Sequence, residues 1–293
     1  MKILNYGSLN IDMVYQVPHI VKPGETISAT DVMKFAGGKG ANQSVALAKA
    51  GAPVWHAGTI GQDGLWLLDL LQKFSVHTEL VSHYEGSSGQ AIIQVSEEGQ
   101  NSIFLFGGGN QSNTEEVIDN ALSQFGEGDY LVLQNEVNLI PYIIEKAHAR
   151  GMKICLNPAP YTEEVKSWPL SKLDLLVVNE IEGRDLTGLE GSFEETLTEL
   201  TRMYPGMSIL LTAGKEGAYF AKDKMREYVP IFDSPVVDTT AAGDTFFGYF
   251  LAGRLEGMTV KAAMELATKA SSITVSRPGA MESIPYIREL LEK

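Results

Sequence analysis

Short apolar runs that alternate with helical patterns constrain the fold of this chain more than any other feature. The runs have the length and composition of buried strands. The order strand, helix, strand, helix predicts a mostly parallel sheet with helices on both faces, so we expect an α/β fold. Ligands in such folds gather at the carboxyl ends of the strands. The predicted strands are 2–7, 54–61, 130–134, 152–158, 174–180 and 208–214, and the predicted helices include 41–51, 138–151 and 192–204.

Two regions interrupt this order with residues that alternate between apolar and polar, as in half-exposed strands. In the second region the stretch 96-SEEGQ-100 predicts a hairpin. We expect a separate small sheet that covers the site as a lid or pairs with its copy in a dimer. The predicted strands there are 11–17, 25–35, 89–95 and 101–106. The predicted domains are an α/β domain of residues 1–8, 36–87 and 107–293 and a β lid of residues 9–35 and 88–106.

The balance of charge excludes some classes of partner. Lys and Arg number 23, Asp and Glu number 37, the formal net charge is −14, and there is no basic run. Such a surface repels nucleic acid and anionic membranes, whereas an anionic small substrate can still bind in a locally positive pocket. The single cysteine, Cys155, fits a reducing cytoplasm. We find no apolar core of a signal peptide and no run near the ~18 residues of a membrane span, so we expect a cytoplasmic protein.

Three glycines surround Lys39 in the stretch 35-FAGGKGANQ-43, which precedes a predicted helix. Glycines let the backbone approach a ligand closely, and the lysine adds a point charge. The stretch is not a Walker phosphate loop, because Gly40 follows Lys39 where that motif has Ser or Thr. An ordinary strand-to-helix turn with a solvated lysine explains the pattern equally well.

The stretch 7-GSLNID-12 places Asn10 and Asp12 on one face of a predicted strand. This pair suits a polyol, because the carboxylate can accept two hydroxyl hydrogen bonds while the amide both donates and accepts. Taken alone, the pattern is explained more simply by a solvent-exposed strand edge.

Two further polar stretches follow predicted strands. In 179-NEIE-182, Asn179 and Glu182 could orient waters around Mg²⁺, although a helix N-cap followed by acidic residues is the commoner reason for such a pattern. In 212-TAGKEG-217, Thr212 and the glycines could form either an anion nest or a hairpin turn.

The apolar stretch 236-VVDTTAAGDTFFGYFLAG-253 carries Asp244 directly after a flexible glycine, Gly243. The glycine allows a tight turn, and a buried helix is predicted behind it, ending near Gly253. One interpretation is that Asp244 is only a first-turn carboxylate stabilised by the helix dipole. The other is that free N–H groups at the helix start hold an anion while Asp244 takes a proton beside it.

These stretches, in this order, resemble the ribokinase family of carbohydrate kinases. The two most specific are 35-FAGGKGANQSVALAKAG-51 and 237-VDTTAAGDTFFG-248, and the resemblance runs from Gly7 to about Pro285. One departure is Trp66 in 61-GQDGLW-66, where the family has a glycine. The resemblance implies a Rossmann-like α/β domain with a small β lid and a homodimer formed through that lid. It also implies ATP, Mg²⁺ and a monovalent cation, K⁺, as cofactors.

The resemblance also implies site residues, position by position. The sugar hydroxyls are expected at Asn10, Asp12, Gly38, Lys39, Gly40, Asn42 and Glu136. ATP and its Mg²⁺ are expected at Asn179, Glu182, Thr212, Gly214, Lys215, Gly217, Gly243 and Thr268, the last where the family has Asn or His near adenine. The monovalent cation is expected at Asp238, Thr240, Thr274, Arg277, Gly279 and Ser283, mostly through backbone carbonyls, in a stretch that by itself predicts only a turn.

The implied reaction is ATP-dependent phosphorylation of a sugar primary hydroxyl. Asp244 would remove the hydroxyl proton while the amides of Ala241, Ala242 and Gly243 stabilise the transferred phosphoryl group. The family strings imply D-ribose as substrate and ribose 5-phosphate as product. Another sugar, a deoxy-sugar or a nucleoside remains an alternative, with room for a base near 104-FLFGGGN-110. A non-catalytic sensor would be expected to lack Asp244 or Lys39, and both are present.

Overall fold

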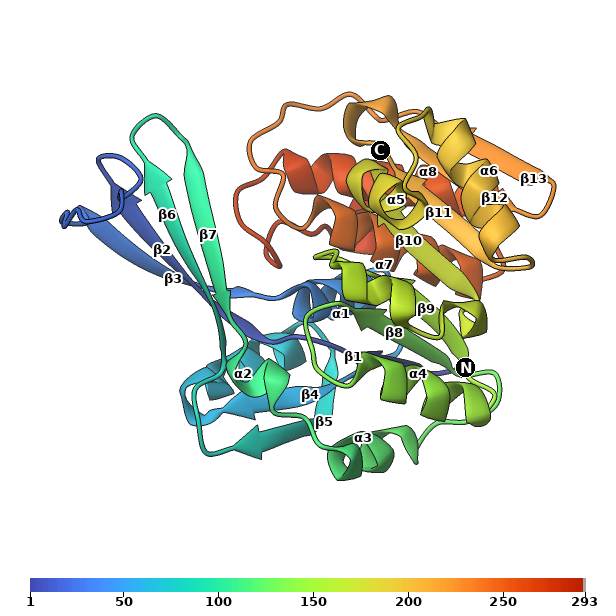
Figure 1. Ribbon diagram of the computed structural model, residues 1–293, viewed down its shortest axis with the longest axis horizontal. Coiled ribbons are helices and arrows are strands. Elements are labelled where there is room, and N and C mark those ends of the chain that lie inside the picture. Colours follow the sequence, from blue (N-terminus) through green and yellow to red (C-terminus); the bar gives the residue numbers. More distant parts are fainter. Residues whose placement is uncertain (292–293) are drawn as a thin grey trace.

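The computed structural model describes residues 1–291 and contains one large sheet and one small sheet (Figure 1). Within this part of the chain the large sheet has nine strands in the order β13-β12-β11-β10-β9-β8-β1-β4-β5, and all neighbouring pairs are parallel except β11 with β12 and β12 with β13. The prediction of an α/β fold with a mostly parallel sheet is therefore confirmed. The strands are β1 (Ile3–Tyr6), β4 (Val54–Gly61), β5 (His77–Tyr84), β8 (Tyr130–Gln134), β9 (Lys153–Asn157), β10 (Leu175–Asn179), β11 (Ser208–Thr212), β12 (Ala218–Lys222) and β13 (Met225–Val229).

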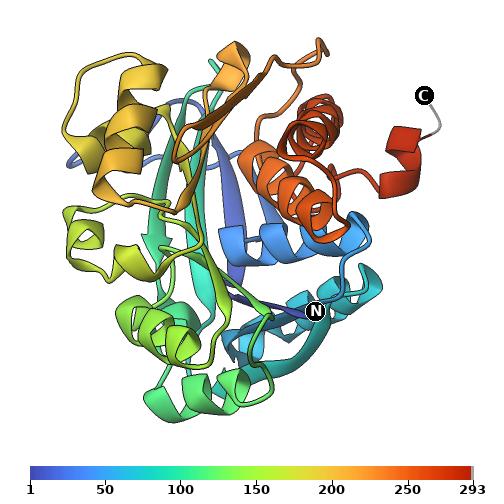
Figure 2. The same ribbon diagram turned by 90° about the vertical axis from the view of Figure 1, so that its right-hand side faces the viewer.

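Helices cover both faces of this sheet, as Figure 2 shows edge-on. Two separate apolar cores result, because successive side chains of a strand point to opposite faces. In β8, for example, Val132 packs in one core, whereas Leu131 and Leu133 pack in the other. One face carries α1 (Lys39–Lys49), α2 (Leu65–Lys73), α7 (Ala242–Leu255), α8 (Val260–Val275) and α9 (Ile287–Leu291), and the other carries α3 (Glu115–Leu122), α4 (Ile140–Ala149), α5 (Glu180–Thr187) and α6 (Phe193–Met203).

The small sheet projects from the α/β domain in Figure 1 and has the strand order β3-β2-β6-β7. Its central pair, β2 with β6, is parallel, and the two outer pairs are antiparallel. The predicted hairpin is present, since β6 and β7 are joined by a turn in which the Gly99 N–H donates to Ser96 O at 2.9 Å. The strands are β2 (Asn10–Val17), β3 (Asp31–Gly37), β6 (Gly89–Ser96) and β7 (Asn101–Phe106).

The strand predicted over 25–35 is shorter in the structure. Only residues from Asp31 onward form β3, and Asp31 pairs with Gln16 near the end of β2. Residues before Thr30 would have to pair beyond Val17, where Pro18 has no N–H to donate. The alternation of apolar and polar residues over 25–30 was therefore misleading.

Two helices cross at very close range to build the centre of the molecule. A Cβ added to Gly248 of α7 would lie 2.5 Å from the Cβ of Ala46 in α1, so the backbones can approach this closely only with glycine at this position. The helix predicted to end near Gly253 continues to Leu255 and is followed by Gly257, which has a φ of +82°. The crossing brings the start of α1 beside the start of α7.

No helix within residues 1–291 is both long enough and apolar enough to cross a membrane.

Candidate active site

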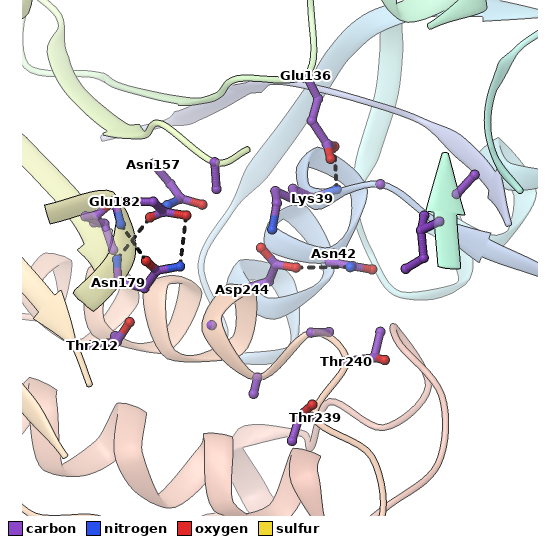
Figure 3. A pocket seen from close by; sticks show the side chains of 18 of the residues that line it. Lys39, Asn42, Glu136, Asn157, Asn179, Glu182, Thr212, Thr239, Thr240 and Asp244 are labelled. Atoms are coloured by element: carbon purple, nitrogen blue, oxygen red, sulfur yellow. Dashed lines mark hydrogen bonds between the residues drawn. The ribbon is translucent and has the colours of Figure 1, made fainter. Parts of the chain in front are cut away.

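A cavity of about 570 Å³ lies between the lid and the carboxyl ends of the large sheet's strands. Figure 3 shows its polar lining, which comes from segments far apart in the sequence. Predicted sugar-site residues in the lining are Asn10, Asp12, Gly38, Lys39, Asn42, Glu136 and Asp244. Predicted residues of the ATP side and the cation site in the same lining are Asn179, Glu182, Thr212, Gly214, Thr240, Ala241, Ala242 and Gly243. The sequence analysis missed the apolar lid wall of Ala91, Ile93, Ile103 and Leu105, and also missed Asn157.

The glycines around Lys39 serve mainly the geometry of the backbone. Gly38 has a φ of +96°, which permits the sharp turn from β3 into α1. A Cβ on Gly40 would lie 2.3 Å from the backbone nitrogen of Ser8, so α1 begins in direct contact with the end of β1. Gly37 leaves the space that the Asp12 carboxylate fills, because its added Cβ would lie 2.1 Å from Asp12 Oδ2.

Two acidic side chains lie on the lid side of the cavity. Glu136 accepts hydrogen bonds from the Ser8 hydroxyl and from the Lys39 backbone N–H, the latter at 2.9 Å. Burial raises the pKa of Glu136. Burial, together with the nearby charge of Glu136, raises the pKa of Asp12 to about 7. Burial alone would lower the pKa of Lys39, but the carboxylates of Asp244 and Glu136 raise it instead, so its ammonium stays charged. The lid side of the cavity thus combines strong acceptors with one cation.

Asn10 has a carbonyl oxygen that is already engaged. Asn110 donates its Nδ2 hydrogen to Asn10 Oδ1 at 2.7 Å, and Asn110 Oδ1 in turn accepts from the Leu9 N–H at 2.9 Å. The sequence analysis expected this amide both to donate and to accept. Its Nδ2 hydrogens remain for a ligand, which complements the acceptor Asp12.

Asp244 lies in the first turn of α7, 7% exposed, with both carboxylate oxygens hydrogen-bonded. Asn42 Nδ2 donates to Oδ2 at 3.1 Å, and Gln43 Nε2 donates to Oδ1 at 2.9 Å (Figure 3 shows the first bond). α7 begins after Ala241, whose φ of 60° is left-handed. Helix starts leave N–H groups without intrahelical partners, and a Cβ added to Gly243 would meet open space. A buried carboxylate and a helix start that could hold an anion therefore lie side by side.

Asn179 and Glu182 form a capping box at the start of α5. Asn179 Oδ1 accepts from the N–H of Glu182 at 2.8 Å, and Glu182 Oε2 accepts from the Asn179 N–H at 3.0 Å. The structural interpretation of this pattern is correct, yet both side chains also line the cavity, facing Thr212 (Figure 3). Burial raises the pKa of Glu182.

A second cavity of about 510 Å³ adjoins the first and shares Thr212, Gly214 and Gly243 with it. It also contains the predicted residues Lys215, Gly217 and Thr268. The stretch 212–217 turns β11 into the antiparallel strand β12, so the expected hairpin is present. The apolar walls of the second cavity include Ile231, Phe232 and Val236, which the sequence analysis missed because they follow no strand or helix pattern.

The residues predicted for a monovalent cation divide into two groups. Asp238 accepts from the N–H of Thr240 at 2.9 Å and from the N–H of Gly279 at 3.0 Å, which joins two loops. The second group is Thr274, Arg277 and Ser283, whose side chains are hydrogen-bonded to other residues. Thr274 bonds Thr245, Arg277 pairs with Glu289, and Ser283 donates to Ala280 O. Within residues 1–291 no cluster of three or more His, Cys, Asp or Glu side chains could hold a metal ion.

Comparison with known proteins gives the class of this molecule. Residues 1–287 match the family described as pfkB family carbohydrate kinase. The chain belongs to this family of carbohydrate kinases, which confirms the resemblance seen in the sequence.

Curated relatives and solved structures cover nearly all of the chain. The ribokinase of Staphylococcus aureus is 36% identical, with 99% of this chain and 98% of the relative covered, and a deoxyribokinase of Salmonella typhimurium is 32% identical, with 100% and 98% covered. The ribokinase of Cryptococcus neoformans in complex with ADP has a TM-score of 0.87 at 33% identity, with 99% of both chains covered. The Arabidopsis thaliana ribokinase complexed with ribose and ATP has a TM-score of 0.86 at 28% identity, with 99% and 97% covered.

The raised pKa of Asp12 predicts a pH-dependent cost to folding. Between the unperturbed value of 3.8 and about 7 the folded protein holds a proton that the unfolded chain has lost, so rising pH lowers the free energy of unfolding in this window. Asp12→Asn removes this effect. We expect the variant to gain about 1–2 kcal/mol of stability at pH 8 and nothing at pH 4, measured by urea unfolding. An equal difference at both pH values would contradict the argument.

Proposed function

We propose that this protein is an ATP-dependent ribokinase that phosphorylates the primary hydroxyl of D-ribose to give ribose 5-phosphate. The observation that carries the proposal is the position of Asp244. Its buried carboxylate lies at a helix start, in a cavity whose lid side is rich in polar groups and which adjoins a second cavity. The ribose and ATP bound by the Arabidopsis relative support the same assignment.

The sugar is proposed to bind under the lid. Asp12 and Glu136 accept hydrogen bonds from sugar hydroxyls, while Asn10 and Lys39 donate to sugar oxygens. Gly38 allows the backbone to approach the ring, whereas Gly40, also predicted for the sugar, packs against Ser8 outside the cavity lining, and Asn42 would contact the sugar beside Asp244. The apolar lid residues Ile93 and Leu105 would cover the carbon face of the ring and exclude water.

ATP is proposed to bind across the two adjoining cavities. The apolar second cavity would hold adenine near Thr268, and the turn at Thr212, Gly214, Lys215 and Gly217 would hold phosphate oxygens. Mg²⁺ keeps most of its hydration and binds chiefly to substrate phosphates, so no all-protein cage is needed. Asn179 and Glu182 would orient its waters. Mg²⁺, when bound, neutralises developing phosphate charge.

The proposed chemistry is carried by the start of α7. Asp244 accepts the proton of the sugar primary hydroxyl as that oxygen attacks the γ-phosphoryl group. The N–H groups of Ala241, Ala242 and Gly243 are proposed to stabilise the charge of the transferred group, and the Ala242 N–H, which donates to Thr239 O at 3.2 Å, would exchange that partner for a phosphoryl oxygen. The loops joined by Asp238 would hold K⁺ through the carbonyls of Thr240, Thr274, Arg277, Gly279 and Ser283, and so fix the position of this helix start.

ADP release measured with a panel of acceptors tests the substrate proposal. We expect Mg²⁺-dependent turnover on D-ribose that exceeds turnover on 2-deoxyribose, fructose, tagatose and nucleosides, and that is faster in K⁺ than in Na⁺. Turnover on 2-deoxyribose alone would support the kinase activity and identify 2-deoxyribose, in place of D-ribose, as the substrate. A folded protein that binds ATP but turns over no acceptor would favour a non-catalytic sensor.

Nucleosides are the less favoured acceptors for a structural reason. The glycines near 104–110 were expected to leave room for a base. Instead, a Cβ on Gly108 would lie 2.4 Å from Ser87 O, and a Cβ on Gly109 would lie 2.4 Å from Thr59 O. These glycines therefore allow tight backbone packing and do not line the first cavity.

Replacement of Asp244 tests the proposed mechanism. Asp244→Asn keeps the size of the side chain but cannot accept the proton. We expect kcat to fall by about 10²-fold or more, because general-base catalysis is typically worth this much. D-Ribose binding measured by calorimetry should change little. A variant whose kcat is close to that of the wild type would show that Asp244 is not the catalytic base.

We also propose a homodimer formed through the lid. The outer face of β7 carries Phe104 and Phe106, 58% and 51% exposed, next to an edge that lacks a further strand in the described chain. Such an exposed apolar edge favours association. Phe104→Lys should shift the sedimenting species from dimer to monomer, whereas Met225→Lys on the edge strand β13 should not. A wild-type monomer at micromolar concentration would reject the dimer.

A cytoplasmic location is proposed because the only cysteine, Cys155, is buried and reduced and because the proposed substrate is ATP. Recovery of the protein in an exported fraction during cell fractionation would reject this location.

A further inference from the structure

A chain of hydrogen bonds between buried side chains extends from Asp244 into the centre of the large sheet. Gln43 Nε2 donates to Asp244 Oδ1 at 2.9 Å, and Gln134 Nε2 donates to Gln43 Oε1 at 2.7 Å. Gln134 Nε2 also donates to Asn5 Oδ1 at 2.9 Å. Asn5 Nδ2 then donates to Ser44 Oγ at 2.8 Å. All four of these supporting side chains are 0% or 1% exposed.

This chain of hydrogen bonds ends at His56, which stays neutral. Ser44 Oγ accepts from Asn5 and lies 2.8 Å from His56 Nδ1, so its own hydrogen is free to be donated to that nitrogen. Burial lowers the pKa of His56 to about 4, which keeps the imidazole an acceptor at neutral pH. The Gln134 amide donates both to Asn5 and to Gln43. The side-chain carbonyl of Gln43 therefore faces Gln134 as the acceptor, and the NH₂ of Gln43 must face Asp244.

The Asp244 carboxylate needs such a support. The torsion that turns a carboxylate about its Cβ–Cγ bond is soft and broad, so one hydrogen bond does not fix its plane. Asn42 and Gln43, adjacent in α1, each hold a different oxygen of Asp244. Asn42 lines the cavity and is proposed to contact the sugar, whereas Gln43 is absent from the cavity lining.

We propose that Gln43 is the positioning residue for Asp244, holding the plane of the carboxylate while Asn42 exchanges contacts with the substrate. This inference rests on the proposed function of Asp244 as base. It assigns Gln43 no contact with sugar or ATP. Its amide is itself held in place by Gln134, which links the base to the centre of the sheet.

The test is steady-state kinetics of Gln43→Met, which keeps the side-chain length and removes the amide. We expect kcat to fall about 10–100-fold, because small misplacements of reacting groups cost this much, while KM for sugar and ATP stays within about 3-fold. Gln43→Glu, which replaces the donor with a second carboxylate beside the first, should lower kcat at least as far.

A double-mutant cycle separates positioning from a purely structural role. In an Asp244→Ala background, Gln43→Met should lower kcat no further. A 10-fold loss that persists there would overturn the inference, as would a rise in KM with kcat unchanged. Gln72→Met, a matched change at an exposed glutamine that bonds Thr78, should leave kcat and KM unaltered. If wild type phosphorylates no acceptor, the proposed function fails; if wild type is active and Gln43→Met matches it, only this inference fails.

Discussion

The close crossing of α1 and α7 is the contact on which the site depends. Glycine at 248 lets the two helices approach until Ala46 fills the space that a side chain would take. The crossing brings the amides of Asn42 and Gln43, in the first turns of α1, against Asp244 in the first turn of α7. The start of α7 also faces the first cavity, where a helix dipole favours anions, whereas the first N–H groups of α1 donate to Glu136 and Ser8. One packing contact therefore sets both the base and the anion-binding geometry.

The electrostatics of the cavity differ from those of the surface. The chain carries a net charge of −14, yet Lys39 lies in the cavity between Glu136 on the lid side and Asp244 and Glu182 on the other. Burial raises the pKa of Asp12, Glu136 and Glu182, so the protein holds these acceptors in a costly state before any ligand arrives. Hydroxyl groups of a sugar can replace the lost water contacts of these carboxylates. Burial of these carboxylates lowers the stability of the free protein but preorganises the site, as is expected where ligand binding restores the lost hydrogen bonds.

The sequence predicted β1, β4, β8, β9, β10 and β11 of the large sheet because buried parallel strands are continuous apolar runs, such as 130–134, but it did not predict β5 or β13. The resemblance to the carbohydrate kinase family implied which polar residues would line a cavity, from Asn10 to Asp244. It did not predict that Gln43 holds Asp244, because that contact joins residues 201 apart in sequence and has no periodic signal. A polar residue on the buried side of α1, next to Asn42, was the available clue. The first part of the strand predicted over 25–35, before Asp31, was wrong because local alternation cannot show whether a partner strand is present.

The most direct measurement is a crystal structure of the protein with D-ribose and a non-hydrolysable ATP analogue. The account predicts that the primary hydroxyl oxygen lies within hydrogen-bond distance of an Asp244 oxygen, with the terminal phosphate against the N–H groups at the start of α7. It also predicts that the Gln43 bond to Asp244 is kept in the complex. A sugar whose primary hydroxyl points away from Asp244, or a terminal phosphate outside the first cavity, would contradict the account.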